Sequence, residues 1–266
     1  MKHDAPVRIA ALLAAIAAAA GTVVAVLLLT RSQHPPGRSV DVPVLMYHLV
    51  GPLPKVRTPT SVKLTVQPAV FAAQMEWLAR HGFHAVTALQ LYDALELGTP
   101  LPSRPVVLTF DDGYRDVLAN AAPVLRRLHM PATAFVITDR VGGPDPSFLD
   151  WRDLKELERD GFAIGSHTVH HLRLPSLSTA QARLELTRSR ATLERHLGRS
   201  VRWFAYPDGA EDAAVVRLVR QAGYLLAFTT QHGVAQYARE PFLLHRYEIP
   251  RSDGVAGFAA LLHSAQ

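Results

Sequence analysis

A largely apolar stretch that ends at two adjacent acids constrains this chain more than any other feature. Residues 106–110 are strand-forming, and Asp111, Asp112 and Gly113 follow at once. Such a run indicates a buried strand, so the acids are expected at the rim of a sheet, where α/β proteins keep their chemistry. Two ionised carboxylates repel each other and are tolerated best beside a metal ion or a shared proton. Asp-Asp-Gly is also ordinary turn chemistry, so the rest of the chain must decide between a site and a turn.

Strand-like and helix-like segments alternate along the chain, which favours an α/β fold with a largely parallel sheet wrapped by helices. The pattern predicts strands at residues 42–48, 83–86, 105–110, 132–137, 162–166, 201–205 and 224–229, with an extended segment at 243–249. It predicts helices at residues 68–80, 88–97, 114–128, 151–160, 178–197, 213–222 and 255–262, with the 114–128 helix interrupted or kinked near Pro123. Residues 51–63, with three prolines and three cations, are expected to form a long irregular loop. We find no internal repeat.

Near the N-terminus, residues 9–30 form a stretch of 22 residues without a charge. About 20 apolar residues span a bilayer, whereas the apolar part of a cleaved signal peptide usually has only about 7 to 15. We therefore expect residues 1–31 to be a signal anchor with a single transmembrane helix, residues 32–41 a linker and residues 42–266 the folded domain. A short N-terminal tail is easiest to leave in the cytoplasm, so the domain is expected on the extracytoplasmic side of the cell membrane. Secretion after signal cleavage is the alternative.

Charge and composition argue against several classes of function. The 266-residue chain has a formal net charge of +5, but residues 1–40 hold four cations and one acid, which leaves +2 for the rest. No dense run of Lys and Arg follows residue 40, so a nucleic-acid partner is not expected. Without cysteine, the chain can form neither a disulfide nor a thiolate metal site.

Three histidines within five residues are the second informative stretch. His167, His170 and His171 follow the strand predicted at residues 162–166. His167 and His171 are four residues apart, so on one helical turn both imidazoles would face the same side. His170 offers a three-residue alternative, and a polar turn is the plain interpretation. Two histidines and one carboxylate are a common set of protein ligands for a divalent metal ion. One acid of the 111–112 pair can therefore bind metal while the other accepts a proton.

Together the two motifs resemble the signatures of the polysaccharide deacetylases, the family that shares the NodB homology domain. In that family the first motif is Thr-Phe-Asp-Asp-Gly, as in residues 109–113, and the second is His-Ser/Thr-x-x-His, as in residues 167–171. The resemblance runs from about Val42 to Leu262. It implies a distorted (β/α) barrel.

Carried over position by position, the resemblance implies a role for each of these side chains. Asp111 would be the general base. Asp112, His167 and His171 would bind a divalent metal ion, with zinc the first choice and cobalt or nickel as alternatives, because two imidazoles and a carboxylate accept all three.

The third family motif is altered in this chain. The family usually has Arg-x-Pro-Tyr-Gly, whereas residues 205–209 are Ala-Tyr-Pro-Asp-Gly. Tyr206, Pro207 and Asp208 are therefore candidates for substrate contacts, with the backbone N–H of Asp208 placed to hold an oxyanion. The cation that orients the base is missing from this motif, and we offer Arg246 as a hypothetical substitute.

Two histidines compete for the role of general acid. The family uses a late histidine, which His245 matches. However, residues 43–48 resemble the opening strand of a subgroup with rearranged motif order, which includes the biofilm poly-N-acetylglucosamine deacetylases, and in that subgroup an N-terminal histidine takes this role. We expect His48 to be the acid, with His245 second.

The resemblance implies a metal-dependent hydrolase that removes N-acetyl groups from a polysaccharide containing N-acetylglucosamine, such as peptidoglycan or poly-β-1,6-N-acetylglucosamine. The alternatives are a small-molecule amide or imide hydrolase on the same scaffold and a non-catalytic glycan-binding relative. Exposed aromatic side chains beside the site would favour a polymer, and Trp151 and Tyr206 are the candidates, with core packing as the competing role.

Asp150 is expected to cap the helix that follows it.

Overall fold

The structure is a computed structural model that describes residues 37–55 and 57–264. The stretch expected to span a membrane, residues 9–30, lies outside this part. Among the described residues, no helix combines the length and the apolar character that crossing a bilayer requires.

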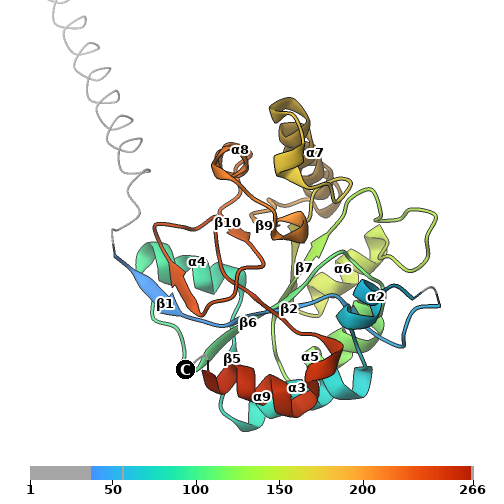
Figure 1. The fold of residues 1–266 in the computed structure, drawn as a ribbon, viewed down its shortest axis with the longest axis vertical. Coiled ribbons are helices and arrows are strands. Elements are labelled where there is room, and N and C mark those ends of the chain that lie inside the picture. Colours follow the sequence, from blue (N-terminus) through green and yellow to red (C-terminus); the bar gives the residue numbers. More distant parts are fainter. Residues whose placement is uncertain (1–36, 56, 265–266) are drawn as a thin grey trace, which may run out of the picture. The chain divides into compact units, whose positions relative to one another are not determined.

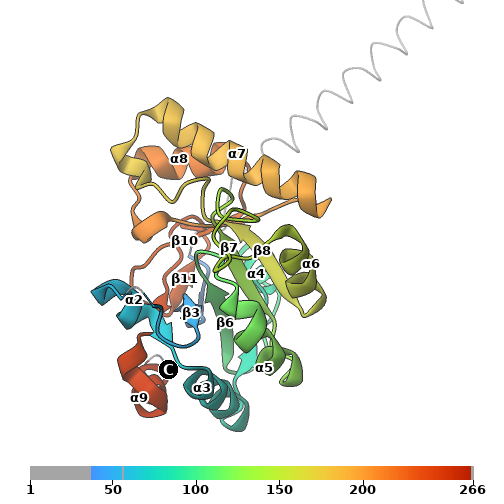
Figure 2. The same cartoon turned by 90° about the vertical axis from the view of Figure 1, so that its right-hand side faces the viewer.

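A curled parallel sheet forms the centre of the fold (Figures 1 and 2). Its strands, in spatial order, are β10 (Leu226–Phe228), β9 (Trp203–Ala205), β8 (Phe162–Ser166), β7 (Ala132–Val136), β6 (Pro105–Phe110), β2 (Val44–Tyr47) and β12 (Tyr247–Glu248), with β5 (His84–Ala85) paired to β6. Every pair in this sheet is parallel. The α/β class and the parallel sheet predicted from the alternation are therefore confirmed.

The extended segment at residues 243–249, which includes β12, contacts strands near both edges of this sheet. Next to β10, the N–H of Leu244 donates to the carbonyl of Ala227 at 3.0 Å, and the carbonyl of Leu244 accepts from the N–H of Thr229 at 2.9 Å. A few residues later, β12 pairs with β2, Tyr247 lying opposite Leu45. One short segment thus holds together strands from opposite edges, which keeps the sheet curled.

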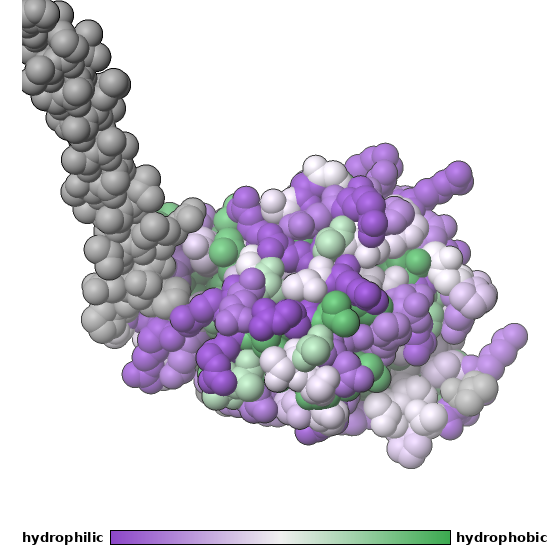
Figure 3. Space-filling model, turned by 90° about the horizontal axis from the view of Figure 1, so that it is seen from above, coloured by the Kyte–Doolittle hydropathy of each residue, from purple (hydrophilic) through white to green (hydrophobic). Residues whose placement is uncertain are grey.

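Helices surround the sheet (Figure 1). They are α2 (Pro59–Leu64), α3 (Pro68–Arg80), α4 (Ala88–Leu97), α5 (Ala122–Arg127), α6 (Trp151–Arg159), α7 (Thr179–Leu197), α8 (Ala213–Gln221) and α9 (Gly254–Ser264). Both ribbon views place α3 beside α9 and α7 beside α8. Hydrophilic side chains cover most of the face drawn in Figure 3, and hydrophobic ones form small separate patches.

Alternate residues of the strands enter two hydrophobic cores. Leu108 of β6 lies in the larger core, with Phe71 of α3, whereas its neighbour Val107 lies in the smaller core, with Leu91 of α4. Because both faces of the parallel strands are covered, the strands are apolar on both sides, as the run at residues 106–110 indicated.

Several local predictions can be compared with the structure. The predicted interruption near Pro123 is confirmed, because a π-helical segment, η1 (Val117–Ala121), precedes α5. Asp150 caps α6 as expected and accepts from the N–H groups of Arg152 and Asp153 at 2.7 and 2.9 Å.

Two segments differ from their predicted form. The irregular loop expected at residues 51–63 is wrong at its end, where Thr58 and Ser61 cap each other's backbone N–H and begin α2. Within the stretch assigned to the linker, β1 (Ser39–Asp41) pairs with β11 (Ala235–Tyr237) in an antiparallel ribbon. Another short pair, β3 (Leu49–Val50) with β4 (Thr65–Val66), flanks α2. Such two- and three-residue pairs carry too little apolar periodicity to be recognised from sequence.

Candidate active site

The predicted site residues meet where the parallel strands end. Asp111 follows β6, His167 follows β8, Tyr206 follows β9 and His48 follows β2. A cavity of about 430 Å³, here called the central cavity, opens at this rim. Its lining includes seven of the predicted site residues, namely His48, Asp111, Asp112, His167, His171, Tyr206 and Asp208.

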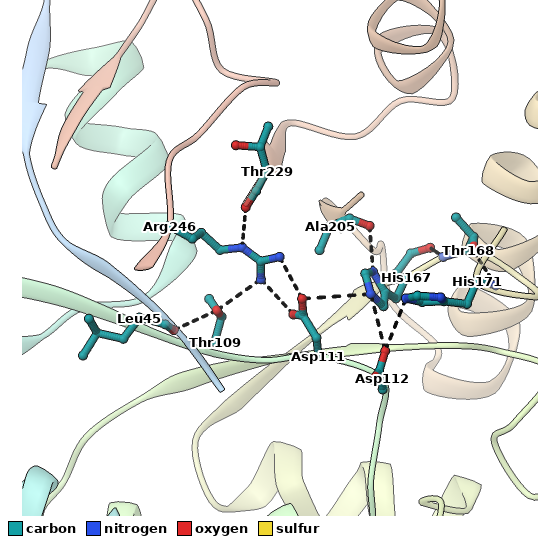
Figure 4. Close-up of polar contacts among 11 residues, drawn as sticks. Leu45, Thr109, Asp111, Asp112, His167, Thr168, His171, Ala205, Thr229 and Arg246 are labelled. Atoms are coloured by element: carbon teal, nitrogen blue, oxygen red, sulfur yellow. Dashed lines mark hydrogen bonds and ion pairs between the residues drawn. The ribbon is translucent and has the colours of Figure 1, made fainter. Parts of the chain in front are cut away.

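Asp111 is held by Arg246, which comes from the far end of the chain (Figure 4). The guanidinium Nη1 and Nη2 donate to the two carboxylate oxygens of Asp111 at 2.8 and 2.7 Å, a bidentate ion pair. Arg246 is fully buried, and its Nε donates to the carbonyl of Thr229 at 2.8 Å. The structure therefore places the cation suggested from the sequence directly against the suggested base.

Two opposing effects set the ionisation of Asp111. Burial acts to raise its pKa, but the charge of Arg246, the nearby His167 and the hydrogen bonds from Arg246 together lower the pKa to about 2. The carboxylate is therefore ionised at any pH near neutrality. The same ion pair makes Asp111 a weak base, because a low pKa lowers its affinity for a proton.

Asp112, His167 and His171 form a group that can hold a metal ion. Oδ1 of Asp112 lies 3.6 Å from Nε2 of His167 and 3.5 Å from Nε2 of His171. The three potential ligand atoms all lie within 4.8 Å of one another. His167 uses Nδ1 to contact the carbonyl of Ala205 at 2.8 Å, which leaves its Nε2 lone pair facing Asp112. Burial lowers the pKa of His167, which favours the neutral form that binds metals. The donor set fits a divalent transition metal.

The backbone that brings the two histidines together is not helical. The expectation of one helical turn at residues 167–171 is wrong, because Thr168 and His171 have φ angles of 69° and 59°. The hydroxyl of Thr168 accepts from the N–H of His171 at 2.9 Å and stabilises this tight loop. A left-handed φ is unusual for a β-branched residue, and it costs of order 1–3 kcal/mol. This backbone conformation directs both imidazoles toward Asp112.

His170 points away from the metal-binding group. Its Nδ1 contacts Oε1 of Glu185 on α7 at 2.6 Å. The other oxygen of Glu185 accepts from the N–H groups of Val169 and His170 at 3.0 and 2.9 Å. The alternative three-residue spacing is therefore not the arrangement found, and Glu185 anchors the loop instead.

The two candidate acids have different surroundings. His48 is half-buried, lines the central cavity and lies near enough to Asp111 to lower its pKa. His245 is not part of that lining. Neighbouring residues of an extended segment point to opposite sides, so Arg246 reaches Asp111 while His245 turns toward Gly233. Of the two histidines, the geometry places His48 with the other site residues.

The altered third motif still contributes to the cavity. Tyr206 is fully buried and donates from its hydroxyl to the carbonyl of Phe242 at 3.0 Å, so it is not the exposed aromatic considered for polymer binding. Pro207 is buried, whereas Asp208 is exposed at the cavity with a φ of 56°. Trp151 stacks on His196 with ring centroids 3.8 Å apart and is not among the residues that line the central cavity.

Two residues at the site were missed in the sequence. Tyr114 lines the central cavity, and a hydrogen bond to Asp112 contributes to raising its pKa, after burial and the charge of Asp112. Its position directly after the Asp-Asp-Gly turn was a usable signal. Glu185 could have been found by its spacing, because it shares the buried face of α7 with Ala182 and Leu186.

Fold and site together define an α/β protein with a buried, ionised carboxylate beside three side chains that can hold a metal ion, at the rim of a curled parallel sheet. The family model described as polysaccharide deacetylase matches residues 98–227, which include both motifs. The chain belongs to the polysaccharide deacetylase family, and it is an enzyme of that class.

Three relatives, two of them of known structure, agree with this assignment. A crystal structure of a "putative polysaccharide deacetylase" from Bacillus anthracis is 30% identical, with a TM-score of 0.74, over 84% of this chain and 69% of that one. The Streptococcus pyogenes deacetylase solved in complex with acetate is 26% identical, with a TM-score of 0.76, over 85% of this chain and 99% of that one. Poly-beta-1,6-N-acetyl-D-glucosamine N-deacetylase of Staphylococcus aureus is 28% identical over 179 residues, which are 63% of this chain and 61% of that relative.

Proposed function

We propose that this deacetylase removes N-acetyl groups from a polysaccharide containing N-acetylglucosamine in a metal-dependent reaction. The observation that carries the proposal is an ionised carboxylate, Asp111, 4.0 Å from Nε2 of His167 and beside the group that can hold a metal ion. Similarity to a poly-β-1,6-N-acetylglucosamine deacetylase supports this polymer as a substrate, with peptidoglycan as the second candidate.

Asp112, His167 and His171 would hold the ion, for which we propose zinc first and cobalt or nickel as alternatives. When bound, it would polarise the acetyl carbonyl and lower the pKa of a water molecule from 15.7 towards about 7. Asp111 would accept a proton from the attacking water, and Arg246 keeps that carboxylate ionised and in place. His48 would protonate the leaving amine from the same cavity. The backbone N–H of Asp208 would stabilise the developing oxyanion.

Acetate release from defined glycans tests this proposal. The purified protein is assayed on poly-β-1,6-N-acetylglucosamine and on peptidoglycan, before and after treatment with a chelator, and again with zinc restored. We expect activity that the chelator abolishes and zinc restores. Asp112→Ala and His171→Ala should lose both metal affinity and activity, whereas the control His84→Ala, at an exposed histidine on β5, should behave as wild type.

Other outcomes point elsewhere. Chelator-resistant acetate release would contradict the metal-dependent reaction. Hydrolysis of small amides or imides with no release from either polymer would support the small-molecule alternative instead.

Asp111→Asn should still bind metal yet turn over about 10²–10⁴ times more slowly, the usual contribution of a general base.

We also propose that residues 9–30 anchor the enzyme in the cell membrane, with the folded domain on the extracytoplasmic side. The length of the uncharged stretch supports this proposal. Fractionation of cells that make the full chain tests it. Recovery in the membrane fraction, with the domain digested by protease added to spheroplasts, is expected, and a shortened protein in the medium would favour cleavage and secretion.

A further inference from the structure

The extended segment that carries Arg246 into the site is held by a side chain from another strand. Oε1 of Gln236, on β11, accepts from the N–H of His245 at 3.0 Å. Nε2 of Gln236 donates to the carbonyl of His245 at 3.1 Å. One side-chain amide thus bonds both backbone groups of His245, as a neighbouring strand does in a sheet. The next residue in the chain is Arg246.

Gln236 is itself buried and well fixed. Its side chain points into the protein, whereas Ala235 and Tyr237, its neighbours on β11, are partly exposed, because successive residues of a strand point to opposite sides. Its Nε2 also donates to the carbonyl of Val42, two residues before β2, at 3.1 Å. Both donors of the amide and its acceptor are therefore used. Because a carbonyl only accepts and an N–H only donates, these partners allow one orientation of the amide.

The guanidinium of Arg246 makes several directional contacts at once (Figure 4). Nε donates to the carbonyl of Thr229 at 2.8 Å, and Nη1 donates to the hydroxyl of Thr109 at 3.3 Å. The bidentate contact to Asp111 adds two bonds of 2.8 and 2.7 Å. Hydrogen bonds weaken steeply when distance or angle departs from the optimum, so this set depends on where the backbone of Arg246 lies. A misplacement of about 1 Å in a site can cost about a hundredfold in rate.

We propose that Gln236 is a positioning residue for deacetylation, which fixes the His245 peptide so that the Arg246 guanidinium holds both oxygens of Asp111. This inference rests on the proposed function, in which Asp111 is the base. Gln236 is not among the residues that line the central cavity, so it acts through Arg246.

A pair of matched variants tests this role. Gln236→Met keeps a side chain of similar length and removes the amide that bonds His245. Gln74→Met is the control, because Gln74, on α3, is also buried and bonded at both ends of its amide. Its Oε1 accepts from the hydroxyl of Tyr47 at 2.9 Å, and its Nε2 donates to the carbonyl of Gly254 at 2.9 Å. The control thus loses a buried amide that has no contact with the Arg246 segment.

A double-mutant cycle with Arg246→Lys separates positioning from a general loss of stability. Arg246→Lys keeps the charge but cannot form the bidentate contact. In the wild-type background, Gln236→Met should lower kcat by about 10–100-fold and leave KM nearly unchanged. In the Arg246→Lys background the same change should lower kcat by no more than about twofold, because the contact that it disturbs is already lost. Gln74→Met should leave kcat unchanged in both backgrounds.

Hydrogen exchange of the Arg246 Nε–H gives a second readout that needs no substrate. This proton is buried and bonded to Thr229, so it should exchange slowly in the wild type. NMR of arginine-labelled protein measures its rate, and urea unfolding shows that each variant is folded. Gln236→Met should speed the exchange by about tenfold or more, since the segment opens more often, whereas Gln74→Met should not change it.

Gln236→Asn provides a milder variant. It keeps the amide on a side chain one methylene shorter, so it should fall between the wild type and Gln236→Met in both measurements. It takes the place of Gln236→Met in the cycle if that protein does not fold. Equal losses of kcat in both backgrounds, or an Arg246 Nε–H that exchanges as slowly as in the wild type, would overturn the inference.

The two proposals can fail separately. Faster Nε–H exchange in Gln236→Met, in a wild type that releases no acetate from any acetylated glycan, would keep the role of Gln236 in holding Arg246 and remove the proposed reaction. Acetate release with unchanged exchange would leave the reaction standing and remove the role of Gln236.

Discussion

Arg246 decides whether Asp111 is a usable base. The pair is buried and bidentate, and removing one partner of such a pair commonly destabilises a protein by about 3–5 kcal/mol. Without the cation, burial dominates and the pKa of Asp111 should rise. The carboxylate would then be protonated at a pH where the wild type is ionised.

For Arg246→Ala we therefore expect a lower kcat/KM and an acidic limb of the pH–rate profile that moves to higher pH. Arg246→Lys, which keeps the charge but not the bidentate contact, should fall between this variant and the wild type. The profile is measured from pH 4 to 9, with Arg217→Ala, at an exposed position of α8, as control. An unchanged profile in Arg246→Ala would remove the role given to Arg246.

Asp116 gives a prediction about stability and pH. Burial raises its pKa to about 6 from an ordinary value of 3.8, despite backbone hydrogen bonds from Val50 and Val117 that lower it. Its folded pKa is the higher one, so folding favours the protonated form. Its contribution to stability is thus greatest below pH 4 and is lost as the pH rises to about 6.

Asp116→Asn should accordingly stabilise the protein at pH 8 by about 1–3 kcal/mol relative to wild type and have little effect at pH 4. Urea unfolding of both proteins at the two pH values measures the difference. A stabilisation that does not grow with pH would show that burying the ionised Asp116 carboxylate does not reduce the free energy of unfolding.

Individual site residues could be predicted from the sequence where residues adjacent in the chain form a recognisable motif. Asp111, Asp112, His167 and His171 were identified from two short motifs, and the structure brings them to one rim. Arg246 could be suggested as a cation but not placed, because 135 residues separate it from Asp111. Tyr114 and Glu185 were missed although each has a local signal in the sequence, because their contacts with Asp112 and with His170 form only in the folded chain.

At the level of elements, the loop at residues 167–171 shows the limit of spacing arguments. A separation of four positions between His167 and His171 is compatible with a helical turn, yet the left-handed φ of Thr168 brings the two histidines together in another way. What holds this loop is Glu185, whose carboxylate accepts two backbone N–H groups and contacts His170. The metal affinity of the site should therefore depend on α7.

Glu185→Ala should weaken metal binding by about 10–100-fold, the usual effect of losing a residue that orients ligands. Arg188→Ala, at an exposed position of the same helix, should leave it unchanged. Competition with a coloured chelator measures the affinity without relying on turnover. Equal affinities in Glu185→Ala and the wild type would mean that the loop keeps its shape by itself.

For the whole molecule, alternation of strands and helices was enough to predict a parallel sheet with helical cover, because each segment shows its own periodicity. How the sheet curls could not be predicted. The segment at residues 243–249 was expected to be extended, but its partners, β10 and β2, are set by tertiary packing.

Because this segment contacts both edges, it should not detach while the sheet persists. Hydrogen exchange tests this: the amides of Leu244 and Ile249, which donate to Ala227 and Met46, should exchange as slowly as those of the central strand β6. Amides of the β1–β11 ribbon, which is a separate two-stranded sheet, should exchange faster. Fast exchange at Leu244 would show that the curl opens independently.

The long separation between Asp111 and Arg246 has a consequence for how the enzyme is made. A ribosome finishes the strand that carries the acid well before it adds the arginine. Until then Asp111 would be a carboxylate without its cation, and burying it would be unfavourable. A prematurely terminated chain therefore lacks a competent base. Deacetylation would begin only after translation has passed Arg246 and the last strand has docked.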